Sequence, residues 1–178
     1  MRAMRVCVFG AGAVGGNIAV MLARAGADVS VLVRGATLQA VRARGLELHT
    51  PDGVVRANVR ASDDPRELGE QDAVLVTVKQ TALTASAPAI TALLGRDTPA
   101  VFLQNGIPWW YFHGQGNADE GKRIPELDPG DVLWNTVGPQ RAVGGVTSSP
   151  CTVVEPGVVK LAGRGLLVFS AISDGTQS

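Results

Sequence analysis

The sequence has few cysteines, no excess of charge of either sign and no long uninterrupted hydrophobic run. Its two cysteines, Cys7 and Cys151, lie far apart, so we expect free, reduced thiols, with a single disulfide as the alternative. Sixteen basic residues balance sixteen acidic ones, which gives no bulk attraction to nucleic acid or to an anionic membrane. No apolar segment is long enough to span a bilayer. We therefore expect a cytoplasmic protein without a nucleic-acid or membrane partner.

Short β-branched and aromatic runs alternate with segments rich in helix formers over the first hundred residues. Strands that are apolar throughout belong inside a parallel sheet that helices cover on both faces. The sequence therefore predicts an α/β fold of the Rossmann type, with a doubly wound, mostly parallel sheet. The expected strands are 5–9, 28–33, 72–78 and 100–103, the expected helices are 14–25, 37–44 and 82–94, and a hairpin is expected at 46–50 and 54–59. Pro88 is expected to kink the last helix or delay its start.

The second part of the chain has a different character. Residues 113–130 are polar and rich in glycine, proline and charge, which predicts a loop or a lid. Strands are expected at 142–146, 153–161 and 166–169, with Pro156-Gly157 marking a bulge or turn inside the second of them. The chain ends in a polar segment of linker-like composition, so we expect one domain over residues 1–170 and a tail over 171–178.

A glycine-rich segment lies between the first expected strand and the first expected helix. In a G-x-G-x-x-G segment at this place, the first glycine permits a tight turn, the second lets the backbone approach a pyrophosphate, and the third lets the helix pack close to the sheet. Phosphates would then meet free N–H groups at the positive end of the helix. The alternative is a glycine-rich turn that binds nothing. The segment is Gly10-Ala11-Gly12-Ala13-Val14-Gly15.

The end of the second expected strand indicates which dinucleotide would bind. NAD sites usually place Asp or Glu there to hold the ribose 2′-hydroxyl, whereas this chain has Arg34. An arginine can pair with a 2′-phosphate that a carboxylate would repel. We therefore expect NADP(H), assisted by Arg42 or Arg44, and the alternative is that Arg34 is a solvated loop cation.

An ordered set of motifs resembles the ketopantoate reductases (2-dehydropantoate 2-reductases) over essentially the whole chain. The resemblance implies an oxidoreductase that uses NADPH to reduce the keto group of 2-dehydropantoate in pantothenate biosynthesis. The motifs are the glycine segment extended to Gly16, Val76-Thr77-Val78-Lys79, Gln104-Asn105-Gly106 and, more weakly, Gly144-Gly145-Val146 followed by Glu155-Pro156-Gly157-Val158-Val159.

The same resemblance implies roles for single residues. Lys79 and Asn105 would contact the cofactor, Asn105 would also contact the substrate, and the backbone near Cys151 would meet the cofactor. Read without the family, Lys79 is an ordinary helix-entry lysine and Asn105-Gly106 an ordinary turn. Family members carry a C-terminal helical domain with the proton-donating lysine, and we expect that domain to be absent here. No catalytic residue is therefore assigned.

Four of the eight aromatic residues form one cluster, Trp109-Trp110-Tyr111-Phe112. We expect this cluster to be a surface that packs on the absent domain or on a second subunit as a homodimer, and the alternative is a substrate-pocket wall beside Asn105. His113 is expected to pack rather than to catalyse, and no metal site is indicated.

Two other functions stay open. A related NADP-dependent reductase would act on another 2-keto acid or carbonyl compound, because the family resembled is broad and its substrate-selecting residues lie in the C-terminal domain expected to be absent. A non-catalytic nucleotide-binding module would use the glycine segment for binding alone.

Overall fold

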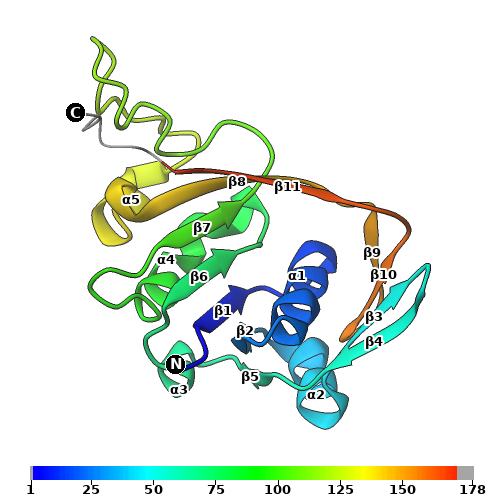
Figure 1. Ribbon diagram of the computed structural model, residues 1–178. Helices are drawn as coiled ribbons and strands as arrows, with labels where there is room; N and C mark the ends of the chain where they lie inside the picture. The colour runs from blue at the N-terminus through cyan, green and yellow to red at the C-terminus, as the bar shows by residue number, and fades with distance from the viewer. Residues whose placement is uncertain (1, 172–178) are drawn as a thin grey trace.

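The structure is a computed structural model that describes residues 2–171. The chain forms two sheets, which lie on either side of helix α1 (Ala13–Arg24) (Figure 1). The large sheet has seven strands in the order β11-β8-β7-β6-β1-β2-β5, and every pairing is parallel except that of β8 with β11. Its strands are β1 (Arg5–Phe9), β2 (Asp28–Leu32), β5 (Arg60–Ser62), β6 (Ala73–Val76), β7 (Ala100–Leu103), β8 (Ala142–Ser148) and β11 (Leu166–Ala171). The strand order reverses at β1, as in doubly wound dinucleotide-binding sheets.

Helices cover both faces of the large sheet, as the apolar strands predict. Helix α1 packs with one apolar cluster that includes Val6, Val8 and Val31, whereas α4 and α5 pack with a second that includes Val74 and Phe102. Side chains alternate between the two faces of a strand, so β1, β2, β6 and β7 each contribute to both clusters. The helices are α1 (Ala13–Arg24), α2 (Gly35–Arg44), α3 (Pro65–Leu68), α4 (Leu83–Thr91) and α5 (Val132–Thr136).

A second sheet of four strands, in the order β4-β3-β10-β9, packs on the other side of α1 (Figure 1). The predicted hairpin forms its β3 and β4, and the expected strand 153–161 becomes two antiparallel strands around a turn at Pro156-Gly157. A Cβ on Gly16 of α1 would lie 2.7 Å from Val159 Cγ2, so the helix approaches this sheet very closely. Its strands are β3 (Leu46–Thr50), β4 (Gly53–Ala57), β9 (Cys151–Glu155) and β10 (Val158–Leu161).

Other element boundaries differ modestly from expectation. Helix α4 begins at Leu83 after a 3₁₀ turn and ends at Thr91 with Pro88 inside it, whereas 82–94 was expected. The strand expected at 72–78 is shortened to β6. The sequence pattern did not predict β5, α3 or α5. The predicted loop over 113–130 is confirmed, and it projects at the top of Figure 1. Of the expected tail, residue 171 ends β11 and 172–178 lie outside the described residues.

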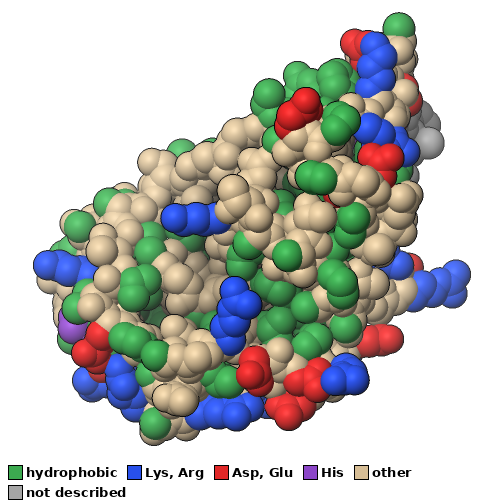
Figure 2. Space-filling view, turned by 180° about the vertical axis from the view of Figure 1, so that it is seen from behind, with side chains coloured by type: hydrophobic (Ala, Val, Ile, Leu, Met, Phe, Trp, Pro, Cys, Tyr) green, Lys and Arg blue, Asp and Glu red, His purple; other side chains and the backbone are tan. Residues whose placement is uncertain are grey.

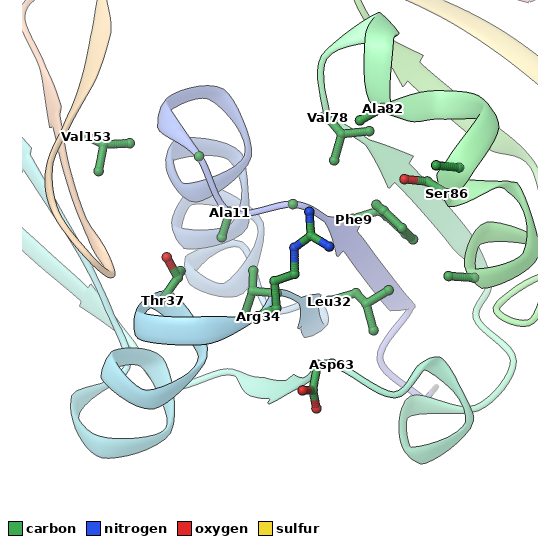
Figure 3. A pocket seen from close by; sticks show the side chains of 15 residues that line it. Phe9, Ala11, Leu32, Arg34, Thr37, Asp63, Val78, Ala82, Ser86 and Val153 are labelled. Atoms are coloured by element: carbon green, nitrogen blue, oxygen red, sulfur yellow. The ribbon is translucent and has the colours of Figure 1, made fainter.

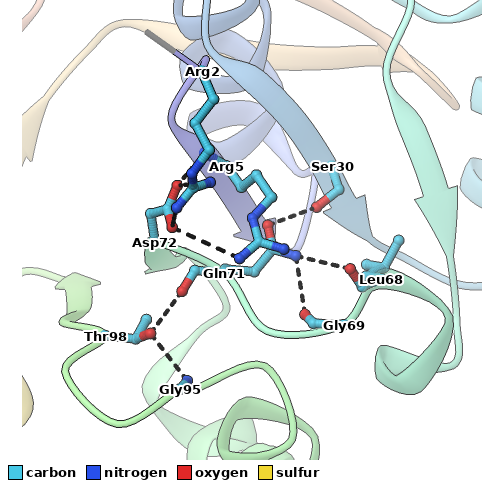
Figure 4. Close-up of polar contacts among 9 residues, drawn as sticks. All are labelled: Arg2, Arg5, Ser30, Leu68, Gly69, Gln71, Asp72, Gly95 and Thr98. Atoms are coloured by element: carbon cyan, nitrogen blue, oxygen red, sulfur yellow. Dashed lines mark hydrogen bonds and ion pairs between the residues drawn. The ribbon is translucent and has the colours of Figure 1, made fainter.

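Buried polar groups hold together the amino-terminal edge of the large sheet (Figure 4). The Gln71 side chain donates to the carbonyls of Leu68 and Gly69, both at 3.0 Å, and Thr98 Oγ1 donates to the Gln71 carbonyl at 2.6 Å. Beside it, the Arg2 guanidinium holds the pKa of the Asp72 carboxyl below its ordinary value. Since these groups satisfy one another, this edge has a structural role and a ligand is expected at the opposite edge.

The thiol of Cys7 is fully buried in β1, and burial raises its pKa to about 11. Cys7 and Cys151 are both free, as expected. Within residues 2–171, no helix combines the length and the apolar character that a membrane crossing requires. Seen from behind, basic and acidic side chains are interspersed along the lower margin and on the projecting loop, while hydrophobic side chains gather in the middle (Figure 2).

Candidate functional site

A cavity of about 420 Å³ opens at the carboxyl ends of β1 and β2, between these strands and α4 (Figure 3). This is the edge where open α/β sheets bind ligands, next to the reversal in strand order. Most of its lining side chains are apolar, while its polar side chains lie after β2, on α2, after β5 and on α4. It is lined by Phe9, Gly10, Ala11, Gly12, Leu32, Val33, Arg34, Thr37, Asp63, Val78, Ala82, Ala85, Ser86, Ala89 and Val153.

The turn after β1 is fixed by contacts to both neighbouring strands. Gly10 has φ +93°, a conformation that favours glycine, and its N–H donates to the Leu32 carbonyl at 3.0 Å. The Thr77 hydroxyl donates to the Gly10 carbonyl at 2.6 Å. A Cβ on Gly15 would lie 1.9 Å from the Gly10 oxygen, so only glycine lets α1 approach the turn. The expected roles of the first and third glycines in the turn and the packing are therefore confirmed.

Gly12 differs from these two glycines because no contact among residues 2–171 requires a glycine there. Its φ is −72°, and a Cβ added there would meet no atom within 4 Å. It is the N-cap residue of α1, which has no side-chain cap, so N–H groups of the first turn are open to a ligand. The open space at Gly12 and the positive end of a twelve-residue helix fit a pyrophosphate.

Arg34 extends from the end of β2 into the cavity, toward the turn that carries Ala11 (Figure 3). Its guanidinium makes no ion pair and no hydrogen bond with any other residue between 2 and 171, and its side chain is exposed. A cation held at this edge without a partner can receive an anionic group of a ligand.

The two arginines expected to assist Arg34 do not line the cavity. Arg42 donates to the Ala61 carbonyl at 3.0 Å, and Arg44 pairs with Glu155 at 2.7 Å. Both therefore tie α2 to neighbouring strands, and their assistance to Arg34 stays a prediction.

Three polar residues of the cavity were not identified from the sequence: Thr37, Asp63 and Ser86. Asp63 follows β5, a three-residue strand of sequence Arg-Ala-Ser with no apolar run to reveal it. Had β5 been recognised, the strand-end rule that drew attention to Arg34 would have drawn attention to Asp63.

Lys79 and Asn105 do not line the cavity, although Val78, the neighbour of Lys79, does. Both follow parallel strands, as expected, and the Gln104 side chain ties the two strand ends together by donating to the Val78 carbonyl at 3.0 Å. Asn105 Oδ1 accepts from the N–H of Thr147 at 3.4 Å, and Lys79 is exposed. Gln104 was not singled out beforehand, although it belongs to the motif that contains Asn105.

The strand that begins at Cys151 also reaches this region. Cys151 itself is not a lining residue, but Val153 of the same strand is. The Cys151 thiol donates to the Ser149 carbonyl at 3.4 Å, and partial burial raises its pKa.

The aromatic cluster does not form the expected surface. Trp109 is 2% exposed and Trp110 is 6% exposed, because both pack against Phe102 of β7 and near α5. Only Tyr111, which is 48% exposed, remains as a substantially exposed aromatic of this group. The expectation of a docking surface is therefore wrong for the two tryptophans.

A smaller cavity of about 150 Å³ bears on the alternative interpretation, in which the aromatic cluster forms the wall of a substrate pocket beside Asn105. Trp110 lines it together with Gln104 and Gly106, the two neighbours of Asn105. His113 packs edge-on against Trp134 at a centroid distance of 5.8 Å, as expected for a packing residue.

Comparisons with known proteins agree with this architecture. The family model described as ketopantoate reductase PanE/ApbA matches residues 6–174. Over 158 residues the chain is 44% identical to the 2-dehydropantoate 2-reductase of Mesorhizobium japonicum, a match that covers 88% of this chain and 48% of the relative.

Solved structures show the same likeness. The crystal structure of a candidate ketopantoate reductase from Ralstonia solanacearum superposes with a TM-score of 0.87 at 38% identity, over 93% of this chain and 52% of that one. A PanE/ApbA family ketopantoate reductase from Ralstonia eutropha gives a TM-score of 0.75 at 32% identity, over 93% and 49%. The chain spans about half the length of the curated relatives that match most of it. The match over residues 6–174 and the 44% identity show that the chain belongs to the ketopantoate reductase PanE/ApbA family.

Proposed function

We propose that the chain binds NADP(H) in the 420 Å³ cavity and supplies the cofactor site of an oxidoreductase that reduces the keto group of 2-dehydropantoate. The observation that carries the proposal is Arg34, an arginine with no side-chain partner in the described part of the chain, in the same cavity as the open glycine turn at Gly12. An anion-binding turn and a separate cation suit a dinucleotide with an additional phosphate.

The chain's own residues would divide the work as follows. Backbone N–H groups of the turn and of the first turn of α1 would hold the pyrophosphate, and Arg34 would pair with the 2′-phosphate. The apolar side chains of Leu32, Val78 and Ala82 would flank the adenine ring. Bound NADPH supplies the hydride. The turn and its helix start comprise Gly10, Ala11, Gly12, Ala13, Val14 and Gly15.

Lys79 and Asn105 complete the proposal at the nicotinamide end. Asn105 follows β7 and can both donate and accept hydrogen bonds, so it suits the cofactor amide and the substrate carbonyl. Lys79 would contact the cofactor from the end of β6, and the backbone near Cys151 would contact it from β9. The two free thiols suit a reducing compartment, and we propose the cytoplasm.

The test is a titration of the protein with NADPH and with NADH, in which binding is monitored by the fluorescence of the cofactor. Arg34→Glu should weaken NADPH binding by about 10- to 100-fold, since it removes charge-assisted hydrogen bonds to the 2′-phosphate, and should change NADH binding by less than about threefold. Arg96→Glu is a matched control, because Arg96 lines a different cavity at the amino ends of the strands. Equal losses for both cofactors with Arg34→Glu would reject NADP(H) selection by this residue.

The substrate is tested separately by following NADPH oxidation with 2-dehydropantoate and with other 2-keto acids, with and without a C-terminal half supplied from a family member. The outcomes below are read from the assay in which that half is supplied. Oxidation that depends on 2-dehydropantoate supports the proposed reaction. Faster turnover with a different 2-keto acid would assign the chain to another reductase of this family. Binding without turnover of any keto acid would leave only the cofactor-binding role.

A further inference from the structure

Asp63 and Arg34 are oppositely charged, line the same cavity and follow neighbouring parallel strands, and both side chains are exposed. Strands β2 and β5 pair with Leu32 opposite Ser62, and the N–H of Val33 donates to the Ser62 carbonyl at 2.9 Å. Each charged residue follows soon after this last bond of the ladder. The two side chains nevertheless form no ion pair with each other, and each lines the cavity.

The backbone on both sides of Asp63 is held by hydrogen bonds. The Ser62 hydroxyl is buried, donates to Glu67 Oε2 at 2.5 Å and accepts from the N–H of Asp64 at 3.0 Å. Asp64 in turn caps α3 by accepting from the N–H of Arg66 at 3.0 Å. The position of Asp63 is therefore set by a fixed turn, while its own carboxylate has no hydrogen-bond partner among residues 2–171.

The side chains of Arg34 and Asp63 lie at different parts of the cavity. The Arg34 guanidinium extends toward the turn that carries Ala11, whereas Asp63 lies on the far side of Leu32 from that turn (Figure 3). A phosphate is favoured near the glycine turn and Arg34 and is repelled by a carboxylate. The group nearest Asp63 is therefore expected to be a hydrogen-bond donor and not an anion.

We propose that Asp63 is a specificity-determining residue that reads the base of the dinucleotide by accepting a hydrogen bond from the exocyclic amine of adenine. The inference rests on the proposed function, since it concerns the same cavity. Apolar side chains from β2 and α4 line the cavity and suit the faces of a flat ring. The edge of that ring then meets a carboxylate, which only accepts hydrogen bonds. Hypoxanthine carries a carbonyl oxygen in place of the amine, and this oxygen would face the carboxylate with no proton between them.

The experiment compares the binding of NADPH with the binding of its hypoxanthine analogue, in the wild type and in Asp63→Asn. The wild type should bind NADPH about tenfold more tightly, because the analogue leaves an acceptor facing an acceptor. Asp63→Asn should bring this ratio to about one, since a carboxamide can donate to the carbonyl and can also accept from the amine. Asp63→Ala should likewise abolish the discrimination, and Asp97→Asn, on a cavity at the opposite edge, should retain it.

The possible results separate the two proposals. Tight NADPH binding with no discrimination against the hypoxanthine analogue would overturn the role of Asp63 and leave the cofactor site intact. If Asp63→Asn tightened NADPH binding, left NADH binding unchanged and preserved the base discrimination, the carboxylate would act on the 2′-phosphate and the inference would be wrong. If the wild type bound neither NADPH nor NADH, the proposed function would fail together with this inference.

Discussion

At the scale of single residues, the glycines of the first turn differ in what requires them. Gly10 is required by its φ of +93°, and Gly15 by the 1.9 Å that would separate its Cβ from the Gly10 oxygen. Gly12 has an ordinary backbone conformation and open space around the position of a Cβ. Gly10 and Gly15 therefore serve the fold, and only Gly12 points to a ligand.

This difference predicts opposite effects for the same substitution. Gly12→Ser should leave the stability unchanged or slightly increase it, because serine is a good N-cap residue and meets no clash. It should weaken NADPH binding by at least about tenfold, because the side chain occupies the space proposed for the pyrophosphate. Gly15→Ser should destabilise the protein by about 1–3 kcal/mol or more through overpacking. Urea denaturation and NADPH titration of both variants provide the test.

Two results would contradict this assignment. Unaltered NADPH binding in Gly12→Ser would show that the pyrophosphate does not pass close to this residue. A folded Gly15→Ser variant of wild-type stability would show that the helix can move away from the turn at little cost.

At the scale of elements, the sequence predicted those that carry a long or strong apolar pattern. Strands β1 and β7 have the predicted bounds, since each is a short apolar run that gives way to glycine or to polar residues, Gly10 after β1 and Gln104-Asn105-Gly106 after β7. By contrast, β5 and α3 have three and four residues with almost no apolar periodicity, and their positions depend on pairing with β2 and on the cap at Asp64. Because β5 was missed, Asp63 was missed with it.

The aromatic cluster shows a second limit of local sequence patterns. Four consecutive aromatic residues suggest a surface, but Trp109 and Trp110 are buried by partners distant in sequence. Trp134, for example, packs against Trp109 with a centroid distance of 6.3 Å, from a five-residue helix that the pattern did not predict. Burial of this kind follows from tertiary contacts, which a window of neighbouring residues does not contain.

The loop over 113–130 provides a prediction at this scale. The Glu120 carboxylate accepts hydrogen bonds from the N–H groups of Gly114, Gln115 and Gly116 at 2.7–2.9 Å. The N–H groups of Gly114 and Gly116 are the main reason that the pKa of Glu120 lies below its ordinary value. A carboxyl with a lowered pKa stabilises the folded loop above its ordinary pKa, and that contribution is lost as the pH falls through the lowered value.

We therefore expect the loop to loosen at acidic pH, below the ordinary range of a glutamate. The amide signals of Gly114 and Gly116 in NMR spectra should shift together with the protonation of Glu120. Glu120→Gln should accelerate amide hydrogen exchange at these positions already at neutral pH, and Glu126→Gln, in the same loop, serves as the control. Unchanged exchange in Glu120→Gln would show that the loop does not depend on this carboxylate.

At the scale of the whole molecule, the cavity belongs to both sheets. The large sheet contributes Phe9 and Leu32, and the small sheet contributes Val153. Helix α1 lies between the two sheets, and its close approach at Gly16 and Val159 fixes the small sheet against it. A ligand in this cavity therefore contacts groups that are brought together only when both sheets are folded.

This arrangement predicts that NADPH stabilises the whole molecule and not only the large sheet. A ligand present at one hundred times its Kd adds about 2.7 kcal/mol to the free energy of unfolding when it binds only the folded state. For a chain of this size the midpoint of thermal unfolding should rise by about 5–10 °C. Gly12→Ser is the control, because it should melt near the wild-type temperature without cofactor and, at the same NADPH concentration, should show a shift no more than about half that of the wild type. Hydrogen exchange locates the effect: with NADPH bound, amides of β3 and β10 should exchange more slowly, as should those of β1 and β2. Protection confined to β1 and β2 would mean that the small sheet unfolds independently of the cofactor site, and the coupling through α1 would then be wrong.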